Sequence, residues 1–90
     1  MIVPIAKVAD FDQFLKVFST SGAEKRKQHG CTGAYVVRDP DDPDRVWCFF
    51  DWEIEGYERF LSDPEIPEIA RGLALLEPPV KADPVAQYDS

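Results

Sequence analysis

The sequence predicts an α+β fold in which helices cover one face of an antiparallel four-stranded sheet. Residues 46–52, Val-Trp-Cys-Phe-Phe-Asp-Trp, are apolar on both sides when their side chains alternate as in a strand. Such a strand belongs in the middle of a sheet whose two faces are both covered. An Asp- and Pro-rich turn joins it to a β-branched segment upstream, and helical apolar stripes lie on both sides of this hairpin.

The chain begins with a predicted strand, Ile2 to Val8, followed by a long helix. Asp10 suits the N-cap of a helix that begins at Phe11 and ends before Gly30. Large apolar residues first recur at helical spacing: Phe11, Phe14, Leu15 and Phe18. The same stripe then becomes small and polar: Ser21, Gly22, Lys25, Gln28 and His29. We therefore expect space beneath the second half of this helix.

The hairpin is formed by two predicted strands, Cys31 to Arg38 and Arg45 to Glu53, around the turn Asp39 to Asp44. A register symmetric about this turn gives four facing pairs: Val37 with Val46, Tyr35 with Cys48, Gly33 with Phe50, and Cys31 with Trp52. In this register the two cysteines lie too far apart to bridge, so we expect free thiols.

The remainder of the chain predicts two helices and an edge strand. Ile54 to Leu61 has its apolar residues on one side, as a short helix does. Asp63 caps a further helix, with Pro64 at its first position. Val80 to Tyr88, interrupted by a proline, is typical of an edge strand. The resulting order, β-α-β-β-α-β, is that of the ferredoxin-like split βαβ fold, in one domain spanning residues 1–90.

Charge and composition exclude several classes of partner. Ten basic residues against 17 acidic ones give a net charge of −7, which repels nucleic-acid phosphates and anionic membrane surfaces. The first residues lack the basic and long apolar regions of a signal peptide. The two cysteines are typical of reduced thiols in a cytoplasm. We expect a cytoplasmic protein with no nucleic-acid partner and no membrane partner.

One face of the predicted sheet has no helix to cover it. With the symmetric register, this face carries Trp47, Phe49, Ala34 and Val36. An exposed apolar patch of this kind usually marks an interface. We therefore predict a homodimer in which two copies pack sheet face against sheet face around a two-fold axis.

Three stretches together resemble a known superfamily: Phe50-Asp51-Trp52, Ser62-Asp63-Pro64-Glu65, and the aromatic helix after Asp10. They are similar to the dimeric α/β-barrel proteins, especially the small antibiotic-biosynthesis-monooxygenase-like and cyclase-like members, over about residues 1–82. The resemblance implies a homodimer whose two sheets form a barrel, with a ligand pocket between helices and sheet in each subunit. Superfamily members include cofactor-free quinol monooxygenases, polyketide cyclases, lactone isomerases and haem-degrading monooxygenases. The sequence has no asparagine, which disfavours the Asn-Trp-His set of the haem-degrading members.

Five residues are candidates for a site. Histidine exchanges a proton near neutral pH, so His29 could act as a general base on a phenol or an enolisable carbonyl; an exposed residue at the helix end is the alternative. Tyr35, Trp52 and Tyr57 could enclose an aromatic ligand, or could belong to the core. Lys25 could hold an anionic group, or could be solvated.

Two functions follow from these residues. The first is a homodimer that binds an aromatic or polyketide-like molecule and could perform cofactor-free oxygenation, cyclisation or isomerisation. The second is a non-catalytic ligand-binding or structural dimer. No metal-ligand spacing and no glycine-rich phosphate loop is present, so we expect no cofactor. A cavity of about 300 Å³ with convergent polar groups would favour a ligand, and a filled interior would favour the structural function.

Overall fold

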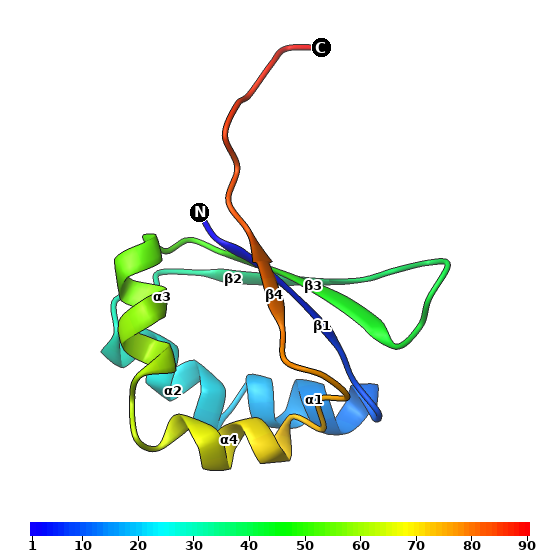
Figure 1. The fold of residues 1–90 in the computed structure, drawn as a ribbon, viewed down its shortest axis with the longest axis vertical. Helices are drawn as coiled ribbons and strands as arrows, with labels where there is room; N and C mark the ends of the chain where they lie inside the picture. Colours follow the sequence, from blue (N-terminus) through cyan, green and yellow to red (C-terminus); the bar gives the residue numbers. More distant parts are fainter.

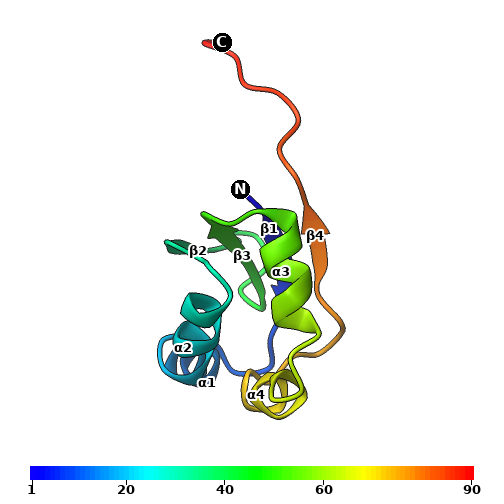
Figure 2. The same ribbon diagram turned by 90° about the vertical axis from the view of Figure 1, so that its left-hand side faces the viewer.

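Four helices lie on one face of a four-stranded antiparallel sheet in the computed structural model, which describes residues 1–90 (Figures 1 and 2). The elements in chain order are β1 (Val3–Lys7), α1 (Phe11–Phe18), α2 (Ser21–Gln28), β2 (Ala34–Arg38), β3 (Arg45–Phe50), α3 (Ile54–Leu61), α4 (Ile66–Gly72) and β4 (Val80–Ala82). The strand order is β2-β3-β1-β4. This arrangement confirms the ferredoxin-like α+β fold and the central place of β3.

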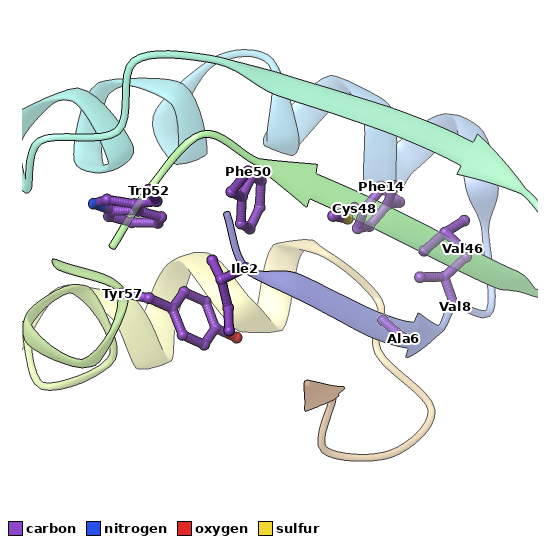
Figure 3. Packing of buried hydrophobic residues seen from close by; sticks show 9 residues of the cluster. All are labelled: Ile2, Ala6, Val8, Phe14, Val46, Cys48, Phe50, Trp52 and Tyr57. Atoms are coloured by element: carbon purple, nitrogen blue, oxygen red, sulfur yellow. The ribbon is translucent and has the colours of Figure 1, made fainter. Parts of the chain in front are cut away.

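The core lies between the sheet and the helices. Alternate residues of β3 point toward the helices, and Val46, Cys48 and Phe50 are buried. Figure 3 shows Phe50 and Trp52 beside the Tyr57 ring from α3, with Cys48 and Val46 farther along β3. The edge of the Trp52 indole packs against both neighbours, with ring centroids 5.7 Å from Phe50 and 5.7 Å from Tyr57.

The long first helix predicted from the sequence is in fact two helices. The hydroxyl groups of Ser19 and Thr20 both donate to the Lys16 carbonyl, at 3.2 and 2.7 Å, which competes with the helical backbone pattern. Thr20 has ψ of −96°, outside the helical range, and α2 starts at the next residue. Gly30 ends α2 with φ of +91°, as expected for a glycine after a helix.

The hairpin register differs from the symmetric one by one residue. Tyr35 faces Phe49 and Val36 faces Cys48, so the predicted pairing was wrong. Ala34 and Val36 therefore lie on the helix side of the sheet, where Val36 packs against the core. The open face instead carries Tyr35, Val37, Trp47 and Phe49, together with Val3 and Ile5 from β1.

The turn explains the shift. Asp39 N–H donates to the Arg45 carbonyl at 3.0 Å, and Arg45 N–H donates to the Asp42 carbonyl at 3.0 Å. The Arg38 guanidinium also donates to the Pro43 carbonyl at 2.8 Å. Asp39 thus faces Arg45 across a loop of residues 40–44, whereas the symmetric register would place Asp39 opposite Asp44. Because side chains alternate, this one-residue difference moves every β2 side chain to the other face.

The C-terminal elements are shorter than predicted. Asp63 does cap a turn, since its Oδ1 accepts the Glu65 N–H at 2.9 Å, but α4 begins only at Ile66. β4 forms just three residues at the sheet edge, whereas the predicted strand ran to Tyr88. The residues after β4 extend away from the body of the molecule (Figure 1).

Both cysteines are free thiols, as expected from their positions on separate parts of the hairpin. Cys48 is buried in the core and Cys31 is half-buried, with its Sγ 3.2 Å from the Gly33 carbonyl. None of the four helices has the length and apolar character needed to cross a bilayer.

Candidate functional site: an apolar cavity beside a charged cluster

An apolar cavity of about 170 Å³ lies between the helices and the sheet. One side is formed by four residues spaced four apart along α1 and α2: Phe14, Phe18, Gly22 and Arg26. Gly22 makes place for the Arg26 side chain, since a Cβ at this position would lie only 3.2 Å from an Arg26 guanidinium nitrogen and 3.2 Å from the Val17 carbonyl oxygen. Space beneath the second half of the first helical segment is therefore confirmed. Its volume falls between the two expected outcomes, since it is below about 300 Å³ but is not filled by side chains.

Of the five residues predicted to form a site, only Tyr57 lines this cavity. Its ring faces the rings of Phe50 and Phe60, with centroids 6.3 and 6.2 Å away. Burial raises the pKa of the Tyr57 hydroxyl, so this group is neutral at physiological pH. The side chain presents its aromatic ring to the cavity, into which almost no polar surface faces.

Trp52 does not line the cavity, but it packs against two residues that do, Tyr57 and Phe60. Its indole Nε1–H donates to the His29 carbonyl at 2.8 Å, and its ring packs against Phe60 with centroids 5.2 Å apart. The contact requires Gly56, because a Cβ at that position would overlap the indole and crowd the His29 carbonyl. The glycine that weakens α3 as a helix former is thus the residue that lets the indole reach α2.

Lys25 and His29 form a charged cluster outside the cavity lining. Asp63 Oδ2 accepts from Lys25 Nζ at 3.0 Å and lies 2.9 Å from His29 Nε2. Lys25 Nζ also lies 2.9 Å from a Glu65 carboxylate oxygen and 3.2 Å from Gln28 Oε1. The cluster ties the end of α2 to the start of α4, and it occupies the groups that a ligand would need.

Hydrogen bonding sets the protonation of this cluster. The contact with His29 holds the pKa of Asp63 well below its ordinary value, helped by the Glu65 N–H and by Lys25. Contacts with Glu65 and Asp63 raise the pKa of Lys25 above its ordinary value. Asp63 is thus an anion and Lys25 a cation over the neutral pH range, and the sequence identified Asp63 only as a cap.

Tyr35 is on the opposite face of the sheet from the cavity. Its side chain is 68% exposed, and its ring lies 6.3 Å from that of Phe49 on the open face. The expectation that Tyr35 lies under the helices depended on the symmetric register and is corrected with it. In a sheet-to-sheet dimer this residue would face the partner subunit.

Arg26 is the cavity residue that sequence reasoning missed. Its side chain is 8% exposed, and one guanidinium nitrogen donates to the Phe18 carbonyl at 3.0 Å. The guanidinium carbon lies 3.8 Å from the centre of the Phe18 ring, within the range of a cation–π contact. The signal that could have found it is the i, i+4 spacing from Phe14 through Phe18 and Gly22, which ends on this arginine.

Known structures share the fold of this chain. A Streptomyces nogalater protein, SnoaB, described as a cofactor-independent oxygenase, aligns over 99% of this chain and 94% of its own with a TM-score of 0.68 and 17% identity. A variant of SnoaB with an asparagine changed to alanine aligns over the same shares with a TM-score of 0.69 and 15% identity. This chain has the fold of the antibiotic biosynthesis monooxygenases.

Two further structures assigned to the antibiotic biosynthesis monooxygenases support that statement. The Bordetella bronchiseptica protein is 21% identical, with a TM-score of 0.63 over 94% of this chain and 95% of its own. The Chloroflexus aurantiacus protein is 23% identical, with a TM-score of 0.59 over 97% and 93% of the two chains. No family model and no curated protein matches the sequence.

Within this monooxygenase-like fold, the cavity is lined mostly by aromatic and aliphatic side chains and offers few groups that react. Burial raises the pKa of the Cys48 thiol to about 12, so the cavity presents it as a neutral thiol. Burial also lowers the pKa of the Arg26 guanidinium, which still remains protonated at neutral pH. The cavity thus has aromatic and aliphatic walls, and almost no polar surface faces into it.

Proposed function

We propose that this protein binds a small aromatic molecule in the cavity and oxygenates it without a cofactor. The observation that carries the proposal is the apolar cavity of about 170 Å³ between the helices and the sheet. The fold shared with SnoaB, described as a cofactor-independent oxygenase, supports the type of reaction. Sequence identities to these structures are below 25%, so the choice of substrate is argued from the residues that line the cavity.

The volume limits the size of the ligand. An engineered protein cavity of roughly 150 Å³ with apolar walls binds benzene, so about 170 Å³ accommodates one aromatic ring and a small substituent. A polycyclic, polyketide-sized molecule would require the helices to move apart. We therefore propose a single-ring substrate.

Cofactor-free oxygenation requires the substrate to supply the electrons. A phenol with a hydrogen para to its hydroxyl reacts with O₂ to give a para-quinone and water. A carbon–oxygen bond forms at the para carbon, the ring C–H, phenol O–H and O–O bonds break, and both hydrogens leave in the water. The phenol provides all four electrons that O₂ accepts. The apolar lining would keep bulk water away from the reacting ring.

The general-base role expected for His29 stays a prediction. Its Nε2 is 2.9 Å from an Asp63 carboxylate oxygen, a contact that would orient the imidazole. Its ring also packs edge-on against Phe60, a cavity residue, with centroids 6.3 Å apart. A His29→Ala protein that retains full turnover would remove this role.

Filling the cavity tests the proposed site. Ala70 on α4 lines the cavity, and Ala70→Leu would place a larger side chain in it. The wild-type protein is titrated with single-ring phenols by protein-observed NMR, and oxygen uptake is followed with an electrode. We expect binding and uptake in the wild type, both lost in Ala70→Leu and kept in Ala86→Leu, a control in the exposed tail. Unchanged binding in Ala70→Leu would place the ligand elsewhere.

Non-catalytic binding is the second candidate function, and the protonation of the lining favours it. Tyr57 and Cys48 are both held neutral by burial, so neither can accept a proton from a ligand at neutral pH. Ligand binding without oxygen uptake from any phenol that binds would support this second function and overturn the first.

We also propose a homodimer through the open sheet face. Trp47 and Phe49 share this face with exposed Tyr35, and no helix of the same chain covers it. Light scattering after size-exclusion chromatography is expected to give twice the chain mass. Trp47→Glu should give a folded monomer, and Tyr88→Glu in the exposed tail should leave the dimer intact. A wild-type monomer at all concentrations would overturn the proposal.

A further inference from the structure

Arg26 is a buried cation without an anionic partner. No carboxylate lies within ion-pair distance of its guanidinium, although the molecule carries 17 acidic residues. One guanidinium nitrogen donates to the Phe18 carbonyl at 3.0 Å, and the other two make no hydrogen bond within the chain. A guanidinium has five N–H donors, so most of its donor capacity is unused.

Aromatic rings compensate this charge only in part. The guanidinium carbon lies 3.8 Å from the centre of the Phe18 ring and 5.6 Å from the centre of the Phe50 ring. Removing a charge from water is costly, and a buried charged group normally gains a paired anion in return. Lys25, the preceding residue, is equally buried and has two carboxylates. The missing anion is thus a feature of the Arg26 position.

The two unused nitrogens of Arg26 have contact with solvent, but not through the apolar cavity. Every fully buried side-chain nitrogen or oxygen in the molecule has a hydrogen-bond partner, so a nitrogen without one is accessible. Almost no polar surface faces into the apolar cavity. These nitrogens are therefore reached from another side of the residue.

A second hollow, of about 130 Å³, provides this access. It is bordered by Ala23, Arg26 and Lys27 of α2 and by residues 31–34, which lead into β2. Figure 2 shows α2 beneath this edge of the sheet. Part of the surface of the hollow is polar, and Arg26 is the one residue that it shares with the apolar cavity. The unused donors of Arg26 therefore belong to this outer hollow.

Two cations and no acidic residue line the outer hollow. Arg26 is buried, whereas Lys27 is exposed. The nearby Asp51 carboxylate accepts from the Thr32 hydroxyl group at 2.6 Å and is not part of the lining. In a molecule with a net charge of −7, this hollow is thus a local site of positive charge that favours an anion.

We propose that the outer hollow binds a phosphate group, with the Arg26 guanidinium and the Lys27 ammonium as its cations. An arginine fork can donate two parallel hydrogen bonds to phosphate oxygens, and a lysine binds phosphate as a point charge. A phosphate group carries about −1.5 to −2 charges at pH 7, which suits two cations better than a carboxylate does. The hollow has room for about four water molecules, close to the size of a phosphate group. This site lies outside the apolar cavity and goes beyond the proposed function.

Inorganic phosphate and acetate, titrated at equal ionic strength near neutral pH, test the site. Binding is followed by chemical-shift changes in labelled protein. In the wild type we expect saturable shifts of Ala23, Thr32 and Ala34, and phosphate should bind about tenfold more tightly than acetate because it makes a further charged contact. Phenyl phosphate then distinguishes the source of the group. Tighter binding than inorganic phosphate would identify an organic phosphate, and equal or weaker binding would identify the free ion.

Variants assign the binding to the two cations. Arg26→Met should lose about tenfold or more in phosphate affinity, because it removes hydrogen bonds from a charged donor. Arg26→Lys, which keeps the charge without the planar fork, should retain part of the affinity and serves if the Met variant does not fold. Lys27→Met should lose less, since that side chain is exposed. Arg71→Met, at an exposed arginine on α4, is the control and should bind phosphate as the wild type does.

Cys31 supplies a second measurement at the same hollow. Its half-buried thiol borders the hollow, whereas the other cysteine, Cys48, is buried in the core. Phosphate should slow the alkylation of Cys31 by iodoacetamide in the wild type and should have little effect on it in Arg26→Met. Mass spectrometry of digested protein measures the rate at Cys31.

Several results would overturn the phosphate site. Shifts confined to Phe14 and Leu73 would place the anion in the apolar cavity, and equal binding of acetate and phosphate would remove the choice of phosphate. Unchanged affinity in both Arg26 variants would show that the guanidinium does not bind the anion. An equal loss in Arg71→Met would show only a general attraction to positive charge. None of these results depends on an aromatic ligand in the cavity, so the proposed function is tested separately.

Discussion

Lys25 and Arg26 are neighbours in sequence and equally buried, at 9% and 8% exposure, yet their surroundings are opposite. Lys25 has two carboxylates and an amide oxygen within 3.2 Å. Arg26 has one carbonyl and two aromatic faces. Lys25 thus joins α2 to the residues before α4 through its carboxylates, whereas Arg26 is held by aromatic faces and makes no ion pair.

Removing the shared carboxylate should have the largest effect on stability. Asp63→Ala leaves Lys25 nearly buried without its principal acceptor and releases His29, while the Asx cap before α4 is lost as well. We expect a large decrease in the urea midpoint of unfolding. The control Asp41→Ala, in the exposed hairpin turn, should change the midpoint little. Equal effects of the two substitutions would show that the cluster does not hold α2 to α4.

A substitution at Gly56, where α3 packs against Trp52, should have the next largest effect on stability. Gly56→Ala forces the Trp52 indole away from the His29 carbonyl, and overpacking of this kind costs about 1–3 kcal/mol. Denaturant unfolding measures the loss, and a change in Trp52 fluorescence reports the displacement. Gly33→Ala is the matched control, because a Cβ there meets only an ordinary contact with Asp51. An unaffected Gly56→Ala protein would contradict the close packing.

Acid should remove the stabilisation that Asp63 provides to Lys25, whereas the surroundings of Arg26 contain no carboxylate that acid could protonate. The pKa of Asp63 is lowered in the folded state from its ordinary value of 3.8, so its contribution is complete above that value. The contribution is lost as pH falls below 3.8 toward the folded pKa. We expect Asp63→Asn to reduce the acid dependence of the unfolding free energy. Some dependence should remain, because Lys7 and the Asp44 N–H also lower the pKa of Asp42.

Replacing the unpaired charge should have the smallest effect on stability. Arg26→Met exchanges a buried cation without a carboxylate for an apolar side chain of similar length, so we expect a change within about 1 kcal/mol. Lys25→Met removes a cation from two carboxylates and should destabilise more than Arg26→Met. Urea unfolding of the two variants side by side makes the comparison. Equal losses would break the distinction between the two neighbours.

The sequence was sufficient to predict which side chains of the central strand are buried. Val46, Cys48, Phe50 and Trp52 are buried as the alternation predicts. The register of its partner was not predictable from the pattern, since Ala34 and Val36 are apolar on one face and Tyr35 and Val37 are apolar on the other. Only the size of the Asp39–Asp44 turn distinguishes the two registers, and several hydrogen bonds within it decide that size.

The candidate site was less predictable for a different reason. Arg26 continues the four-residue spacing of Phe14, Phe18 and Gly22 across the break at Thr20 and lines the cavity, whereas Lys25 pairs with Asp63 and Glu65 just before α4. Asp63 lies 38 residues from Lys25 and 34 from His29, and no local spacing relates residues that far apart. Tyr57 was found because its helix is short, uninterrupted and packed on the predicted face of β3.

The two tryptophans of the molecule lie on opposite sides of one short segment. Trp47 points to the open face, and Trp52 is enclosed among aromatic rings on the other side. A protein with Trp47→Phe would emit only from the enclosed indole, and one with Trp52→Phe only from the outer one. Intrinsic fluorescence would therefore test the proposed dimer and the proposed ligand through two separate optical signals, without any attached dye.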